Sequence, residues 1–166
     1  MSDKIIKFSI LCHRPYSLDG YDKTSYVYKR VIEAIETILH GLEKDDKIVV
    51  GLTKLGLGLD QDFAKICLER DISYHVYLPY RNQESLWVNI PDFDLENYQS
   101  IIDHSSKCIQ VHEGNYSPKK ILQTQSRIIK DSDYILYVNG FWPTQSEYNK
   151  ILYDPCKKLI NLNPYV

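Results

Sequence analysis

Apolar positions along this chain follow two different periods, which alternate from one segment to the next. Short runs rich in β-branched and aromatic residues predict strands, because such runs fit a sheet that is covered on both faces. The predicted strands are Ile5–Cys12, Lys47–Leu52, Ser73–Leu78, Cys108–Val111 and Tyr134–Val138, and Lys158–Leu162 is a further candidate for an edge strand.

Between these runs, apolar residues recur three or four positions apart, which is the spacing along one face of a helix. Helices are therefore predicted over Ser25–Leu42, from Gly58 or Leu59 to about Arg70, over Leu95–Ser105, over Pro118–Asp131 and from Thr144 to about Tyr153, with a short helical segment over Asn82–Asn89. The inward side of helix Pro118–Asp131 is expected to hold Ile121, Leu122, Gln125 or Ile128, and Ile129.

Strands that alternate with helices predict an α/β fold with three layers, α/β/α, and a mostly parallel central sheet joined by right-handed crossovers. The 166 residues are enough for one domain with a sizeable core, and no repeat or linker divides them. Ile5–Cys12 is apolar nearly throughout and is expected at the centre of the sheet. Ligands of such sheets bind at the carboxyl ends of the strands. Four predicted loops lie at that edge: His13–Tyr21, Thr53–Gly58, Pro79–Asn82 and Asn139–Thr144.

Composition and charge restrict the classes of partner. The chain is 43% hydrophobic and 25% charged, as in globular proteins, and its 20 basic and 22 acidic residues give a net charge of −2. This balance argues against nucleic acids and membrane surfaces as partners, because both require a basic face, but it allows a small anionic ligand. No hydrophobic targeting segment follows the N-terminus, and no apolar run is long enough to cross a bilayer, so we expect a cytoplasmic protein.

The four cysteines are far apart and form no CxxC pair, so no metal site is expected. We expect no cofactor either. Cys12 and Cys108 lie in strand-like runs and Cys67 lies on an apolar helix face, which predicts buried, reduced thiols. The 14 tyrosines fit the edges of a core or the surface of a homo-oligomer, and we lean toward a homo-oligomer.

The turn after strand Lys47–Leu52 is the first candidate binding element. Gly56 and Gly58 connect a buried strand to a helix, and this arrangement directs free backbone N–H groups and the positive helix end at an anion, usually a phosphate. A simple change of chain direction explains the same glycines equally well. Asp60 and Gln61 follow in the first helical turn, where Asp60 either accepts hydrogen bonds from ribose hydroxyls or stabilises the helix by its charge.

The other loops contain further candidates, each with a simpler alternative. Arg14, after His13, is placed to pair with a phosphate or to form a surface ion pair, and Trp87 to stack on a base or to pack in the core. Thr144 is placed to cap the last helix, and Glu147 to act as a general base or nucleophile or to lie in solvent. The motifs of P-loop NTPases, α/β-hydrolases and zinc proteases are absent.

Several ordered blocks together resemble YpsA-like proteins of the SLOG superfamily. The first is Cys12-His13-Arg14-Pro15 with Leu18, Gly20 and Tyr21, which is similar to G-H-R-P…L-x-G-Y. The next are Leu57–Gln61 with Ala64, similar to A-L-G-x-D-Q-x-x-A, and Pro79-Tyr80, Gln83–Ser85 and Trp87, similar to P-F…Q-E-x-x-W. Tyr98, Tyr116–Pro118 and Ser132-Asp133 match later positions, so the resemblance covers nearly the whole chain.

This resemblance implies a Rossmann-like domain that binds a nucleotide or a nucleotide-derived ligand. Its relatives include phosphoribohydrolases, the DNA-processing protein DprA and sensors of ADP-ribose-type signals. Combined with the loops above, it implies ligand contacts from His13, Arg14, Tyr21, Gly56, Gly58, Asp60, Gln61, Pro79, Glu84, Trp87, Arg127, Asn139, Gly140 and Thr144.

The chain also departs from the family pattern. Cys12 replaces a glycine, Thr124-Gln125 stand where an Arg-Asn pair is expected unless Arg127 substitutes with a shift, and Trp142-Pro143 replace two glycines of the last phosphate loop. The spacing Thr144…Glu147 matches the catalytic glutamate of the phosphoribohydrolases, whereas their arginine has no clear match. We therefore favour a binding protein (sensor, carrier or sequestering agent) over an N-glycosidic hydrolase of nucleoside 5′-phosphates that uses Glu147.

Overall fold

A computed structural model describes residues 4–12, 25–91, 93–138 and 157–162 of the chain. Its strands are β1 (Ile5–Cys12), β2 (Ile48–Thr53), β3 (Ser73–Leu78), β4 (Lys107–Gln110), β5 (Tyr134–Val138) and β6 (Lys158–Leu162). Its helices are α1 (Tyr26–Lys44), α2 (Leu59–Glu69), α3 (Leu95–Asp103) and α4 (Pro118–Asp131), and a short 3-10 helix, η2, spans Gln83–Trp87. The predicted helix from Thr144 to about Tyr153 lies outside the described residues.

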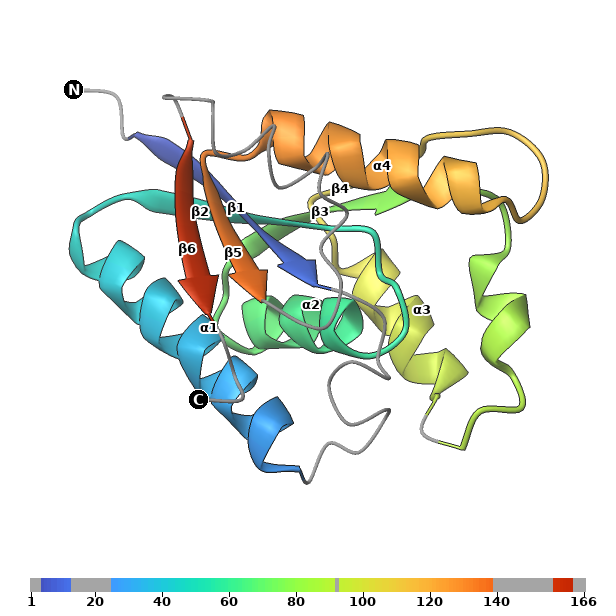
Figure 1. The fold of residues 1–166 in the computed structure, drawn as a ribbon, viewed down its shortest axis with the longest axis horizontal. Coiled ribbons are helices and arrows are strands. Elements are labelled where there is room, and N and C mark those ends of the chain that lie inside the picture. The colour runs from blue at the N-terminus through green and yellow to red at the C-terminus, as the bar shows by residue number, and fades with distance from the viewer. Residues whose placement is uncertain (1–3, 13–24, 92, 139–156, 163–166) are drawn as a thin grey trace.

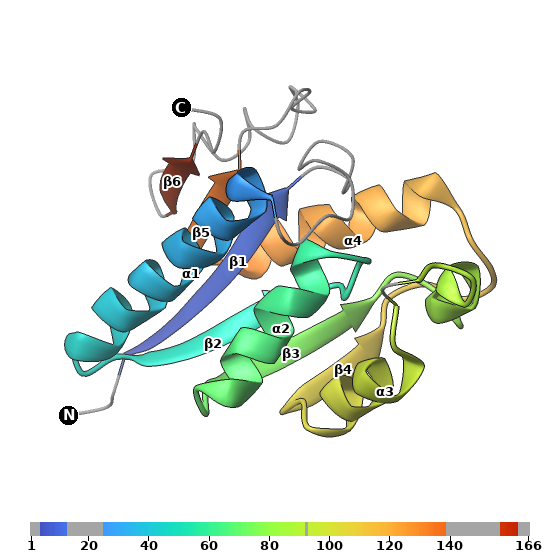
Figure 2. The ribbon, with the colours of Figure 1, turned by 90° about the horizontal axis from the view of Figure 1, so that it is seen from below.

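The six strands form one sheet in the order β4-β3-β2-β1-β5-β6, and every neighbouring pair is parallel. Helices alternate with the strands along the chain, so the fold is α/β and Rossmann-like, as predicted. β1 lies between β2 and β5, which confirms its central position, and β6 lies at the edge. α1, α2 and α3 cover one face of the sheet and α4 covers the other (Figures 1 and 2).

The helix layers divide the core into two parts because successive side chains of a strand point to opposite faces. On the side of α1, α2 and α3, the core is built around side chains such as Phe8, Val76 and Leu136. On the side of α4, two smaller clusters form around Leu11 and Leu52. Both faces of the central strands are therefore buried, as a parallel sheet requires.

Two predictions about individual side chains are wrong. Leu122 is 49% exposed, because the buried side of α4 is formed by Thr124, Gln125, Ile128 and Ile129. Cys108 is exposed, because β4 is a short strand at the edge of the sheet.

Cys67 is buried, as predicted, and burial raises the pKa of its thiol to about 12. The thiol therefore stays protonated and unreactive at neutral pH. Within the described part of the chain, no helix has both the length and the apolar character needed to cross a membrane.

Gly51 allows α2 to approach β2 closely. A Cβ atom at this position would lie 2.9 Å from Cys67 Sγ and 3.1 Å from Phe63 Cζ, and both of these side chains are buried. Such short contacts between packed atoms force the helix or its side chains to move.

We expect Gly51→Ala to lower the free energy of unfolding by about 1–3 kcal/mol, because it overpacks this contact. The matched control is Gly41→Ala in α1, where a Cβ atom would meet nothing within 4 Å. There the change to alanine should raise the free energy of unfolding by about 0.5–1 kcal/mol, since glycine is unfavourable inside a helix. Urea unfolding of both variants checks the prediction, and equal effects at the two positions would contradict it.

Candidate functional site

The candidate site lies at the carboxyl edge of the sheet, where the strand order reverses. The chain adds β2, β3 and β4 on one side of β1 and then β5 and β6 on the other, so the reversal lies between β1 and β5. Ligands of open parallel sheets bind at this point. The segments that follow β1 and β5 lie outside the described residues. Seven predicted site residues belong to them: His13, Arg14, Tyr21, Asn139, Gly140, Thr144 and Glu147.

The described part of the site is centred on the turn between β2 and α2. Gly58 precedes the first residue of α2 with a φ of 94°, a backbone conformation that favours glycine, and no side chain caps this helix end. The carboxylate of Asp60 turns back and accepts a hydrogen bond from the backbone N–H of Gly56 at 3.1 Å. A Cβ atom on Gly56 would lie only 2.8 Å from Asp60 Oδ2, so the absence of a side chain at Gly56 makes room for this contact.

Two more side chains shape the same turn. Gln61 Nε2 donates to the carbonyl oxygen of Leu55 at 3.2 Å. Thr53 Oγ1 accepts from the N–H of Leu55 at 3.0 Å and donates to the carbonyl oxygen of Asp60 at 3.3 Å. Asp60 and Gln61, both predicted as ligand contacts, are thus hydrogen-bonded within the turn itself.

Lys54, the residue after β2, connects this turn to the opposite face of the sheet. Its ammonium group lies 2.8 Å from Asp60 Oδ2 and 2.7 Å from Gln125 Oε1, which belongs to α4. The side chains of Lys54 and Asp60 are only 15% and 13% exposed. An ammonium group has three donors, and these contacts use two of them.

Gln125 is 5% exposed, and its Nε2 atom is buried without a hydrogen-bond acceptor in the described part of the chain. Lysine can only donate, so the atom that faces Lys54 is the amide oxygen, and the orientation of the amide follows. The NH₂ group is therefore a buried donor next to the Lys54 ammonium. Such a group is rare in proteins and calls for an acceptor.

The segment after β3 is anchored to the turn by Gln83. This residue is 3% exposed, and its Nε2 atom donates to the carbonyl oxygen of Lys54 at 2.9 Å and to the Tyr98 hydroxyl at 3.0 Å. Burial raises the pKa of the Tyr98 hydroxyl, which therefore stays neutral, although the hydrogen bond from Gln83 acts in the opposite direction. Pro79, which ends β3, is buried, and Glu84 is half-buried on η2.

Trp87 and Arg127 lie outside this hydrogen-bonded cluster. The Trp87 ring packs edge-on against Phe93 and Tyr98, with centroids 5.5 and 5.9 Å apart. Of the two roles that the sequence allowed for Trp87, base stacking or packing, these contacts correspond to packing. Arg127 is exposed, and its guanidinium carbon lies 5.7 Å from the centroid of the Tyr77 ring. Two residues along a helix differ by about 200° in direction, so Arg127 and Gln125 point to different sides of α4.

The structure thus groups Gly56, Gly58, Asp60 and Gln61 around one turn. The next segment, which contains Pro79 and Glu84, is joined to this turn through the bond from Gln83 to Lys54. The sequence analysis did not identify Lys54, Gln83 or Gln125 as site residues. The position of Lys54, directly between a buried strand and a glycine turn, could have identified it as a candidate site residue. Among the described residues, no group of three or more His, Cys, Asp and Glu side chains is arranged to hold a metal ion.

We expect Gln83→Ala to lower the free energy of unfolding by about 1–3 kcal/mol, because it leaves the Lys54 carbonyl and the Tyr98 hydroxyl without this donor. Gln123→Ala is the matched control, since Gln123 is exposed on α4, and its effect should stay within about 0.5 kcal/mol. Chemical unfolding measures both changes. A Gln83→Ala protein as stable as the control would show that this anchor contributes little.

Comparison with known protein families finds none that matches the chain, and comparison with curated proteins finds no match either.

Proposed function

We propose that this chain is a SLOG-type, YpsA-like protein that binds a nucleotide or a nucleotide-derived small molecule, of the ADP-ribose, NAD-derived or cyclic ADP-ribose class. In this proposal it acts as a sensor, carrier or sequestering protein rather than as an enzyme. The fold supports it, because an all-parallel sheet with a reversal of strand order has a natural ligand position at its carboxyl edge. The ordered sequence blocks support the narrower family assignment.

The observation that carries the proposal is the unpaired amide donor of Gln125 beside the Lys54 ammonium. The Gln125 NH₂ group and the Lys54 ammonium group are both hydrogen-bond donors, and they lie near the start of α2, which no side chain caps. This arrangement favours a ligand with many acceptor oxygens, such as a phosphate or a ribose. Gln125 is also one of the two positions at which the family pattern has an Arg-Asn pair. An amide side chain is kept at this position, and its oxygen accepts a hydrogen bond from Lys54, the residue after β2.

The balance of charge within the cluster bears on the type of ligand. Asp60 already neutralises Lys54, so the described residues alone offer hydrogen bonds rather than an excess of positive charge. A phosphate would need a further cation, and Arg14, which follows the end of β1 by two residues, is the predicted source. We therefore expect the described cluster to contact the uncharged part of the ligand or a single phosphate oxygen.

The first test measures thermal stabilisation by AMP, ADP, NAD, ADP-ribose and cyclic ADP-ribose. A ligand present at about 100 times its Kd should stabilise the wild-type fold by ~2.7 kcal/mol. Gln125→Leu and Lys54→Met should lose most of this shift, each measured against its own melting temperature without ligand. Gln123→Leu, an exposed position on the same helix, is the control and should keep the shift.

If none of these compounds raises the melting temperature of the wild type, the proposal is wrong. If a compound raises it equally in wild type and in Gln125→Leu, the ligand binds elsewhere and the role given to Gln125 is wrong.

The second test separates binding from catalysis. Each compound and a set of nucleoside monophosphates is incubated with the protein and then analysed by chromatography. We expect intact ligand to be recovered from the denatured protein. Release of the base that disappears in Glu147→Ala but persists in Glu113→Ala would instead establish the N-glycosidic hydrolase, with Glu147 as its general base or nucleophile.

A further inference from the structure

The two helix-covered faces of the sheet differ in charge. α4 contains Lys119, Lys120, Arg127 and Lys130, and its only acidic residue is Asp131 at its end. On the opposite face, α2 contains Asp60, Asp62 and Glu69 against Lys65, and α3 contains Glu96 and Asp103 with no basic residue. α1, which lies on the same face as α2 and α3, has three basic and three acidic residues. The molecule therefore has one basic helix on one face of the sheet, and two acidic helices beside a helix of balanced charge on the other; Figure 2 shows where these helices lie.

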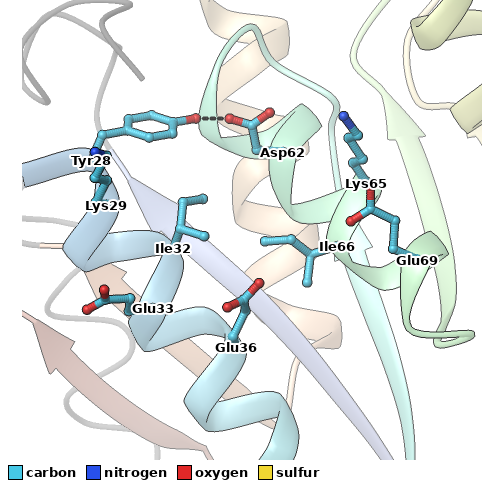
Figure 3. A pocket seen from close by; sticks show the side chains of 9 residues that line it. All are labelled: Tyr28, Lys29, Ile32, Glu33, Glu36, Asp62, Lys65, Ile66 and Glu69. Carbon is cyan, nitrogen blue, oxygen red and sulfur yellow. Dashed lines mark hydrogen bonds between the residues drawn. The ribbon is translucent and has the colours of Figure 1, made fainter. Parts of the chain in front are cut away.

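A groove runs between α1 and α2 on the acidic face (Figure 3). Its volume is about 430 Å³. Ile32 and Ile66 form its apolar part, and the residues that line it also include Tyr28, Lys29, Glu33, Glu36, Asp62, Lys65 and Glu69. Four of these are acidic and two are basic, so the groove has an excess of negative charge.

Three of the acidic side chains are available to a partner. Glu33, Glu36 and Glu69 are exposed, and none of them forms an ion pair or side-chain hydrogen bond within the described ranges. Asp62 differs, because it accepts a hydrogen bond from the Tyr28 hydroxyl across one end of the groove (Figure 3). The groove therefore matches a partner with several cations and an apolar group between them.

The solvent side of α4 has such a combination of cations and an apolar side chain. Lys119, Gln123, Arg127 and Lys130 follow one another at intervals of four, four and three residues, so they form one stripe along the helix. Lys119, Arg127 and Lys130 are exposed. Leu122, beside this stripe, is 49% exposed and supplies an apolar side chain.

One pair of spacings on the two surfaces also agrees. Each residue of a helix adds about 1.5 Å, so Arg127 and Lys130 are separated by roughly 4.5 Å along α4. Along α1, Glu33 and Glu36 are also separated by roughly 4.5 Å. These two cations can thus lie opposite these two carboxylates.

We propose that α4 of one copy of this chain docks into the α1–α2 groove of a second copy. Lys119, Arg127 and Lys130 pair with Glu33, Glu36 and Glu69, and Leu122 packs near Ile32 and Ile66. Because the two surfaces lie on opposite faces of the sheet, the contact is head-to-tail. Such a contact leaves one free surface at each end, so the assembly grows with concentration unless it closes into a ring.

The test uses variants that remove charge without reversing it. Lys119→Gln/Arg127→Gln/Lys130→Gln removes the basic stripe, and Glu33→Gln/Glu36→Gln/Glu69→Gln neutralises the groove. Light scattering coupled to size-exclusion chromatography should show wild-type particles whose mass rises with protein concentration, and monomers for each variant. An equimolar mixture of the two variants should form a dimer and nothing larger, because each variant keeps one intact surface.

Salt provides an independent readout. The screening length falls from about 10 Å at 0.1 M to about 3 Å at 1 M ionic strength, so wild-type association should weaken by on the order of tenfold between these conditions. Lys4→Gln/Lys44→Gln/Lys107→Gln removes the same number of charges at exposed positions outside both surfaces, and it should associate like the wild type. Circular dichroism verifies that every variant is folded.

Three results would overturn the proposal. The first is a wild type that stays monomeric at all concentrations and low salt, which would leave the groove for a basic segment of another protein. The second is an oligomer that persists in either triple variant, and the third is a mixture of folded variants that forms no dimer. None of these results depends on whether the chain binds a nucleotide.

Discussion

The constraint on which this structure depends is that a sheet with only parallel strands must be buried on both faces. β1 meets it at the centre, bonded to β2 on one side and β5 on the other. Its side chains alternate between the core under α1 and α2 and the thinner core under α4. The thinner side includes polar contacts, such as Ser9 Oγ with Ser132 Oγ at 2.7 Å, and both of these residues are fully buried. Because the central strands are held on both sides, the residues at their carboxyl ends are carried by a rigid frame.

Lys54 connects that frame to the candidate site. It lies at the end of β2, and its ammonium group holds the start of α2 through Asp60 and the middle of α4 through Gln125. One largely buried lysine therefore joins elements from both helix layers across the sheet edge. A buried charge is tolerated only when it is paired, and here the carboxylate and the amide oxygen supply the pairing. The remaining amide donor of Gln125 is a buried donor of this cluster that the described residues leave unpaired, which is why the functional proposal depends on it.

The charge difference between the two helix layers is a separate property of the same architecture. In a three-layer fold, each helix has one side against the sheet and another in solvent, so the solvent sides are free to differ in charge. α4 is basic on its solvent side, and α1 and α2 form an acidic groove. A nucleotide site at the strand ends and an association surface on the helix faces would occupy different parts of the molecule, so one chain can hold both.

The sequence by itself determined the order and type of the described elements, the central position of Ile5–Cys12 and the glycine turn at Gly56 and Gly58, because these depend on periodicity and local backbone preference. It did not determine the exposure of Leu122 or Cys108, since burial depends on which helix side meets the sheet and on which strand lies at its edge. Nor did it reveal the Lys54–Gln125 contact or the Gln83–Lys54 contact, which join residues 71 and 29 positions apart. Only the tertiary structure decided these features, because packing brings together side chains that no local pattern relates.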